Sequence, residues 1–505
     1  MDQIGTIQLD PGTGVPLYQQ LFDAIAQRIG SGALAHGARL PPTRTLAERL
    51  GAHRNTVVRA YRALEEAGFI AGTVGRGTYV QRSRTAPALA AVPAAGTAGI
   101  AWGSLMSRQS GAEPLQRAER FAQQLAGPRA IHLSRMQPSE DLLPDQLFRR
   151  CLDHVLTTLG PKALNYAPRA GVPRLREQIA LDLAHQGVSA APDDVIVTSG
   201  SQQALDLLAR LLVNPGDALI VNTATYTGAL SAFTLAGARL ITVPNDDEGP
   251  DLSALERLAQ SGAKGVYLMP GCQNPTGLAI STPRRRALID WSRRCGVPLI
   301  EDDYVSDLHL DGEPPPPLRA FDGDVIYVGT YSKKLIPALR VGYVVAPPAL
   351  RPRLESLKQA SDLGGALIQH ALAEFLERGY LRAHLERVVP EYRARRAALE
   401  RALLEHLPPS IRWQRPGSGL LLWIPLPAGI DPLAVFEAAR EEGVLVMPST
   451  MTQAGDSAEA GVRLTFCGEP PERLEEGARR LGRALARVLE RAGLDRVELG
   501  AVSVI

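Results

Sequence analysis

The chain has few cysteines and no long apolar run, and both absences exclude classes of protein. The four cysteines are scattered without a CxxC pair, so neither a zinc site nor a disulfide framework is expected. No apolar stretch reaches the roughly 18 residues that a membrane-spanning helix needs, and the acidic start MDQIGTIQLD is unlike a signal peptide. We therefore expect a cytoplasmic protein with reduced thiols, no metal and no membrane contact. The cysteines are Cys151, Cys272, Cys295 and Cys467.

Lysine is also scarce, because only five occur among 505 residues. Charged residues make up 21% of the chain and hydrophobic residues 45%, the balance of a globular protein. The length exceeds one ordinary core, so two or more domains are expected. Residues 1–82 hold nine arginines against six acidic residues, which permits nucleic-acid binding without by itself indicating it. The lysines are Lys162, Lys264, Lys333, Lys334 and Lys358.

Composition divides the chain near residue 82. We predict one domain over residues 1–82, a linker and lead-in over 83–128, and a second domain over 129–505 with a smaller part from about residue 380. The linker contains TAPALAAVPAAGTAGIAWG, which is rich in Ala, Pro and Gly and has no period.

The second domain is predicted to be α/β. Apolar runs alternate there with helical patterns, and runs that are apolar on both faces predict a mostly parallel sheet covered by helices on both sides. Helices around GLLLWIPLP and GVRLTF predict an α+β tail. The apolar runs are DVIVTSG, ALIVNTAT, GVYLMP, PLIEDD, DVIYVGTYS and RVGYVVAP.

The N-terminal pattern predicts a winged helix-turn-helix. Apolar residues every four positions give a helix over residues 17–29, Thr43 can cap a second helix that ends at Gly51, and HRNTVVRAYRALEEAGF gives a third. The third helix exposes arginine and asparagine at its start, as a recognition helix does. FIAGTVGRGTYV then predicts a two-stranded wing with Arg76 at its tip. The alternative is a plain helical bundle with solvated arginines.

The segments PLYQQLFDAIAQRIGSGAL, LPPTRTLAERLG, RNTVVRAYRALEEAGFI and GRGTYV together resemble the GntR-type winged helix, which favours the DNA-binding interpretation. His53 stands where that family usually has serine, and as a poorer N-cap it should hold the recognition helix less firmly. The resemblance and the exposed positions give these candidate DNA-binding residues: Arg44, Arg54, Asn55, Thr56, Gly75 and Arg76.

The segment GTYSKKLIPALRVGY places two lysines and an arginine at the end of an apolar strand. An amine beside a hydroxyl and a guanidinium suits a Schiff base with a phosphorylated aldehyde. The alternative is a solvated basic turn. Lys334 competes with Lys333 for the role.

Four further segments follow predicted strands in the same way: TSGSQQALDLL, NTATYTG, MPGCQNPTG and IEDDYVSD. The first begins a helix whose N-terminal amides can hold a phosphate. The others offer Tyr226 to stack on a ring, Asn274 as a donor to a ring hydroxyl and Asp302 as a partner for a pyridine nitrogen. Each signal is weak alone, and their order at strand ends makes them strong together.

In that order these segments resemble the fold-type I aminotransferases, over roughly residues 130–490. The resemblance implies pyridoxal phosphate as cofactor, a Schiff base at Lys333, and a carboxylate-binding arginine at Arg463. It also implies that Tyr166 reaches the phosphate bound by a neighbouring subunit. The remaining implied cofactor residues are Gly200, Ser201, Gln202, Tyr226, Asn274, Asp302, Tyr304, Ser332 and Arg340.

A GntR-like winged helix joined to such a domain resembles the MocR/GabR group of regulators. The resemblance implies a homodimer that binds double-stranded operator DNA and senses an amino compound or pyridoxal phosphate itself. The rival hypothesis is a working aminotransferase, of the aminoadipate or aromatic type, that has kept a DNA-binding appendage. A purely structural domain without cofactor is disfavoured because no key residue is missing.

Overall fold

The computed structural model describes residues 7–73, 77–81, 102–124, 130–305, 307–455 and 460–494. The chain forms two compact units, Met1–Leu105 and Met106–Ile505. Most of the predicted linker lies outside the described residues, and the domain boundaries at 82 and 129 stay predictions. None of the described helices is long and apolar enough to cross a membrane.

The first unit is a winged helix, as predicted. A three-stranded antiparallel sheet in the order β1-β3-β2 packs with three helices around a small apolar core. Leu21, Ile25 and Ile29 form the buried face of the first helix, which is the four-residue spacing seen in the sequence. The elements are α1 (Leu17–Gly30), β1 (Arg39–Leu40), α2 (Thr43–Leu50), α3 (Arg54–Glu66), β2 (Ile70–Thr73) and β3 (Gly77–Val80).

One capping prediction in this unit was wrong. Helix α2 begins at Thr43 itself, with Pro42 before it and no side-chain cap. His53 does cap α3, because its Nδ1 accepts from the backbone N–H of Asn55 at 3.2 Å. An imidazole nitrogen can take the place of the usual hydroxyl when the neutral ring presents its lone pair to the first turn.

The second unit contains a seven-stranded sheet in the order β5-β13-β12-β11-β10-β6-β7, in which only β13 runs antiparallel to its neighbours. The strands match the predicted apolar runs, and β7 was missed. Residues of β12 alternate between two apolar cores, so both faces of the sheet are covered, as predicted. The strands are β5 (Val195–Thr198), β6 (Ala218–Asn222), β7 (Arg239–Val243), β10 (Val266–Leu268), β11 (Leu299–Asp303), β12 (Ile326–Thr330) and β13 (Gly342–Val345).

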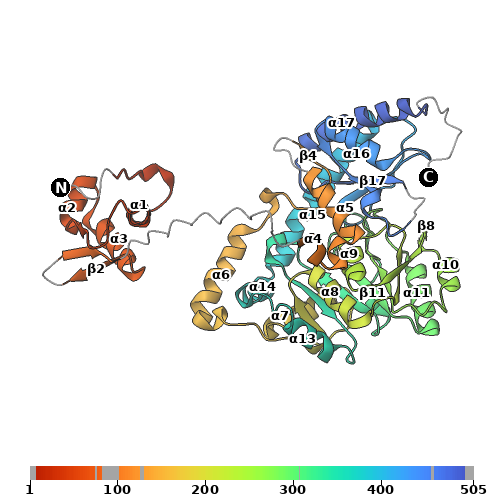
Figure 1. Ribbon diagram of the computed structural model, residues 1–505, viewed down its shortest axis with the longest axis horizontal. Coiled ribbons are helices and arrows are strands. Elements are labelled where there is room, and N and C mark those ends of the chain that lie inside the picture. Colours follow the sequence, from red (N-terminus) through yellow and green to blue (C-terminus); the bar gives the residue numbers. More distant parts are fainter. Residues whose placement is uncertain are drawn as a thin grey trace. The chain divides into compact units, whose positions relative to one another are not determined.

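Helices and a short hairpin connect these strands (Figure 1). The hairpin pairs β8 (Asn245–Asp246) with β9 (Gly249–Pro250). The first two described helices after β3 are α4 (Trp102–Leu105) and α5 (Glu113–Gln124). The others are α6 (Asp145–Leu159), α7 (Pro173–His185), α8 (Ser201–Leu212), α9 (Thr227–Leu235), α10 (Leu252–Arg257), α11 (Thr282–Cys295), α12 (Leu318–Phe321), α13 (Arg351–Gln359) and α14 (Ala366–Glu377).

The C-terminal part, blue in Figure 1, is the α+β tail that the sequence predicted. An antiparallel sheet in the order β14-β17-β16 packs with long helices, and β15 pairs in parallel with β4, a strand from well before the large sheet. The elements are β4 (Ile131–His132), α15 (Tyr380–His406), β14 (Leu421–Pro425), α16 (Pro432–Glu441), β15 (Val444–Leu445), β16 (Met447–Pro448), β17 (Gly461–Thr465) and α17 (Pro471–Arg491).

Candidate functional site

A cavity of about 650 Å³ lies at the carboxyl ends of the parallel strands. Strand ends and helix starts converge there because every parallel strand delivers its following loop to the same edge of the sheet. Ten of the predicted residues line this cavity: Ser201, Gln202, Tyr226, Asn274, Asp302, Tyr304, Ser332, Lys333, Arg340 and Arg463.

The two adjacent lysines point into different surroundings. Lys333 lines the cavity, and its Nζ donates to the carbonyl of Met136 at 2.6 Å. Burial lowers the pKa of Lys333, and the positive charges of Arg463 and Arg340 lower it further. An amine with a lowered pKa is a better nucleophile near neutral pH.

Lys334 is fully buried on the other side of the loop. Its Nζ lies 2.6 Å from a carboxylate oxygen of Asp307 and 3.3 Å from one of Asp182. These two carboxylates outweigh the effect of burial and raise the pKa of Lys334 well above its usual value. A permanently charged, paired lysine is a poor nucleophile, so the geometry favours Lys333 as the reactive amine.

Asp302 lies near the end of β11 with one oxygen paired and the other without a partner. Tyr267 of β10 donates its hydroxyl to Oδ2 at 2.6 Å, while Oδ1 is buried and accepts no hydrogen bond. Burial raises the pKa of Asp302 to about 7, and the neighbouring carboxylate of Asp303 adds to the rise. A buried, unpaired carboxylate oxygen facing a cavity is suited to a ligand that brings an N–H.

The start of α8 supplies an anion-binding corner. Gly200, before the helix, has φ 85°, and a Cβ there would lie 2.7 Å from Nη2 of Arg340, so only glycine fits. Arg340 itself holds a left-handed φ of 50°, and it donates to the carbonyl of Ser199 at 3.1 Å. Ser332 and the first residues of α8 line the same corner. Helix N-terminal amides with a guanidinium and a hydroxyl suit a phosphate group.

Arg463 enters the cavity from β17. One guanidinium nitrogen donates to Oδ1 of Asn274 at 2.8 Å and another to the carbonyl of Ser134 at 2.5 Å, while Nε is buried without a partner. Burial lowers the pKa of Arg463, although arginine stays charged at any physiological pH. A buried guanidinium held only by neutral groups can bind a carboxylate strongly.

Two tyrosines complete the predicted set within the cavity. Tyr226, just before α9, donates its hydroxyl to Oε1 of Gln202 at 3.3 Å. The hydroxyl of Tyr304 is buried without a hydrogen-bond partner, so it can bond a ligand oxygen. Tyr166 does not line the cavity and is 89% exposed.

Several lining residues were missed from the sequence. Tyr267 does not line the cavity itself but donates its hydroxyl to Asp302, and in the sequence it stands only as part of the apolar run GVYLMP. Helix α5, which falls in the predicted linker and lead-in, contributes Ala118, Phe121 and Ala122. The three- and four-residue spacing of these side chains is a helical signal that could have identified α5. Met447 and Met451 also line the cavity, and no local pattern in the sequence indicates them.

The winged helix carries a second candidate site on α2 and α3. Arg54 and Asn55 are exposed at the start of α3, and Thr56 is half-buried. Arg44 is exposed on α2, where Glu48 lies 3.8 Å from its guanidinium. Gly75 and Arg76, predicted at the wing tip, lie outside the described residues.

Comparisons with known proteins agree with the division into a winged helix and a second unit that holds the cavity. The chain matches the family described as bacterial regulatory proteins, gntR family, over residues 17–80, and aminotransferase class I and II over residues 139–481. It is 31% identical to the probable rhizopine catabolism regulatory protein MocR of Rhizobium meliloti, over 96% of this chain and 97% of that protein. It is 33% identical to aromatic-amino-acid aminotransferase 1 of Thermococcus litoralis, over 72% of this chain and 89% of that protein.

Among solved structures, α-aminoadipate aminotransferase LysN from Thermus thermophilus superposes with a TM-score of 0.72. It is 32% identical, and the match covers 78% of this chain and all of LysN. Class I and II aminotransferases depend on pyridoxal phosphate. The chain therefore belongs to the aminotransferase class I and II family in its C-terminal part and, along nearly its whole length, to the MocR type of GntR-family transcription regulators.

Proposed function

We propose that this regulator binds pyridoxal phosphate in the cavity and that an amino compound, or the cofactor itself, controls its binding to operator DNA as a homodimer. The observation that carries the proposal is the convergence of Lys333, Asp302, Arg340 and Arg463 on one cavity, in a chain that also has a winged helix.

The residues present fit this cofactor. The unpaired Oδ1 of Asp302 suits a pyridine N–H, and the corner of Arg340 and α8 suits a phosphate. Lys333, with its lowered pKa, suits an aldehyde. Bound pyridoxal phosphate supplies an aldehyde carbon that reacts with primary amines.

The protein's own groups then select the effector. Arg463 binds a carboxylate and holds the effector toward Lys333. Ala118, Phe121 and Met451 give the rest of the cavity an apolar wall, which favours an effector with an apolar side chain over a second charge. The exposed Tyr166 suits the role of reaching the phosphate in a neighbouring subunit.

The experiment that tests the proposal follows cofactor and DNA together. Purified protein, with pyridoxal phosphate added, is titrated with α-amino acids, ω-amino acids and simple amines while visible absorbance and affinity for selected DNA are measured. If the protein is a regulator, visible absorbance and DNA affinity should change at the same amine concentration. A ligand shifts an equilibrium only through its different affinities for the two states. Absorbance changes without any change in DNA affinity would contradict the proposal.

The rival function is a working aminotransferase, and the full set of lining residues favours it as the second candidate. Catalysis requires Lys333 to move a proton at the α-carbon of the substrate as a general base, a step that sensing does not need. Turnover of common amino acids at ordinary enzymatic rates, about 1–10³ per second, together with no DNA preference, would support the enzyme instead.

Asp302→Asn is expected to stabilise the cofactor-free protein at neutral pH while weakening its affinity for pyridoxal phosphate. The folded pKa of about 7 exceeds the unfolded value of about 3.9, so between these values the unfolded chain loses a proton that the folded protein keeps. Wild-type stability therefore falls through that window, by at most roughly 1.4 kcal/mol per pH unit. The advantage of asparagine should grow from about pH 4 to about pH 7 and then level off.

Thermal melts of both proteins from about pH 4 to about pH 8 measure this difference. Asp217→Asn serves as the matched control, because hydrogen bonds from Asn214 lower the pKa of Asp217 and the substitution should act in the opposite direction. An advantage for Asp302→Asn that shrinks as pH rises would refute the assignment of a destabilising buried carboxylate.

Arg44→Ala and Arg54→Ala are each expected to weaken DNA binding without changing the cofactor's absorbance. Loss of a phosphate contact lowers the slope of log affinity against log salt by about 1, whereas loss of a base contact costs ~1–3 kcal/mol and relaxes specificity at one position. DNA selected from a random library by the wild type provides the ligand. Arg239→Ala, an exposed arginine of the second unit, is the control. Unchanged affinity in both variants would contradict the assigned DNA-binding surface.

A further inference from the structure

Three side-chain amides form a hydrogen-bonded row beside the loop that follows β10. Asn222 Nδ2 donates to Asn245 Oδ1 at 2.7 Å, and Asn245 Nδ2 donates to Gln273 Oε1 at 2.7 Å. Gln273 Nε2 in turn donates to the carbonyl of Ala224 at 3.0 Å. This amide row (Asn222, Asn245 and Gln273) ties the end of β6 to the β8–β9 hairpin and to the loop after β10, which contributes Asn274 to the cavity.

The direction of donation along the amide row is fixed at one end. A carbonyl oxygen only accepts, so Ala224 requires the amide nitrogen of Gln273 to face it. Oε1 of Gln273 must then accept, and it does so from Asn245 and from the hydroxyl of Thr276 at 2.5 Å. Asn222 and Gln273 are each only 4% exposed, so a reversed amide would leave buried groups without partners.

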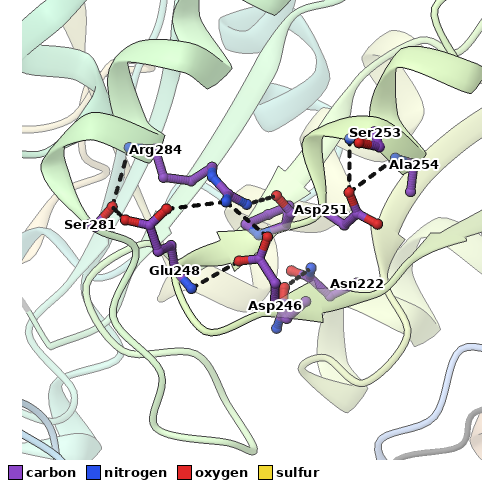
Figure 2. A network of polar contacts seen from close by, with 10 residues as sticks. Asn222, Asp246, Glu248, Asp251, Ser253, Ala254, Ser281 and Arg284 are labelled. Atoms are coloured by element: carbon purple, nitrogen blue, oxygen red, sulfur yellow. Dashed lines mark hydrogen bonds and ion pairs between the residues drawn. The ribbon is translucent and has the colours of Figure 1, made fainter.

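Asn245 lies on the β8–β9 hairpin, and Arg284 of α11 holds that hairpin in place (Figure 2). The Arg284 guanidinium donates to the carbonyl of Pro250 at 2.5 Å and to Asp246 at 2.8 Å, and it reaches Glu248 at 3.3 Å. Arg284 and its bond to Pro250 are buried, whereas the carboxylates of Asp246 and Glu248 are about half exposed. The hairpin therefore presents Asn245 to both neighbours in a fixed position.

The inner end of the row adjoins Asn274. Asn274 directly follows Gln273 in sequence, and its Oδ1 already accepts from Arg463. Nδ2 is thus the group of Asn274 that can donate into the cavity. Through Gln273, the amide row connects this donor to Asn245.

We propose that Asn245 is a positioning residue that holds the Asn274 donor toward the ring oxygen of the cofactor through the amide row. The proposal rests on the proposed binding of pyridoxal phosphate. A donor at the ring oxygen stabilises negative charge there, and this oxygen otherwise holds the proton of the neighbouring Schiff base. If the donor is displaced, the ring oxygen would hold that proton more tightly, and the pH at which the proton is lost would rise.

The test compares the full-length wild type with Asn245→Ala and Asn245→Asp. Aspartate keeps the shape and still accepts from Asn222, but it cannot donate to Gln273. The matched control is Asn214→Ala, which removes an asparagine bonded to Asp217 before the opposite end of β6. Affinity for pyridoxal phosphate and the pH midpoint of its visible absorbance are measured, together with amide hydrogen exchange of residues 271–280 in cofactor-free protein.

Both Asn245 variants are expected to bind pyridoxal phosphate about three- to tenfold more weakly, the effect of one lost hydrogen bond. The pH midpoint should rise, and exchange in residues 271–280 of the cofactor-free protein should quicken. The control should leave all three unchanged. A variant with a lower melting temperature but the wild-type pH midpoint and exchange rate would overturn the proposal, because Asn245 would then contribute only to stability. If the wild type fails to bind pyridoxal phosphate, the proposed function fails, and exchange still decides whether the amide row positions the loop.

Discussion

Lys333→Ala should abolish covalent attachment of pyridoxal phosphate and with it the response of DNA binding to any amine. The reason is chemical, because Lys333 is the only lysine that lines the cavity among the residues that the structure describes. In the wild type, borohydride should fix the cofactor to Lys333, and peptide mapping should recover the label there. The variant should carry no covalently bound cofactor after reduction and dialysis, while its basal DNA affinity stays close to that of the wild type.

Lys334→Met is the matched variant. It should lose stability but keep the covalent attachment of pyridoxal phosphate. It leaves the carboxylates of Asp182 and Asp307 without their shared cation, and breaking such a buried pair typically costs about 3–5 kcal/mol of stability. The folded variant should still become labelled at Lys333. Recovery of the label on residue 334 in the wild type would overturn the assignment of the reactive lysine.

Arg463→Ala should remove the response to carboxylated amines and leave both the cofactor and basal DNA binding in place. Truncating one partner of a buried charge pair costs about 2–5 kcal/mol, which corresponds to an effector affinity lowered from roughly thirtyfold to several thousandfold. Arg463→Lys keeps the charge but not the two-pronged donor, so it should recover only part of the response. Titrations that follow DNA affinity at fixed cofactor concentration measure all three proteins.

Arg396→Ala provides the control for loss of a buried arginine. Arg396 pairs with Asp311 and does not line the cavity, so its removal should lower stability and leave the effector response of the folded protein intact. A normal response in Arg463→Ala would mean that the effector lacks a carboxylate or binds elsewhere. Pyridoxal phosphate itself then becomes the leading effector.

Most of the fold follows from the sequence because its signals are local. Runs such as DVIYVGTYS hold consecutive apolar residues, and strand β12 within that run is buried at every position, as a strand covered on both faces is. β7 was missed because RLITV begins with an exposed arginine and is only half-buried along most of its length, as an edge strand is. The apolar pattern of β7 in the sequence is weaker for that reason.

The lining of the cavity was predictable where a polar residue lies at or just after the end of a strand, as with Lys333 and Asp302. It was not predictable where a residue acts from a distant segment. Ser134 and Met136 supply carbonyls to Arg463 and Lys333 from far away in the sequence, and backbone acceptors leave no trace in residue type. Tyr267 looks like any other apolar strand residue until its hydroxyl is found against Asp302.

The unpaired carboxylate of Asp302 has a consequence for how much of the protein a cell maintains. A buried carboxylate oxygen without a partner lowers the stability of the cofactor-free form, and a ligand that pairs with it adds stability in proportion to the logarithm of its concentration over its dissociation constant. Cellular proteases remove proteins from the unfolded fraction, so a shift of about 1–2 kcal/mol changes abundance several-fold. With pyridoxal phosphate bound as proposed, the number of repressor or activator molecules at the promoter would follow the supply of the cofactor, even when no effector is present.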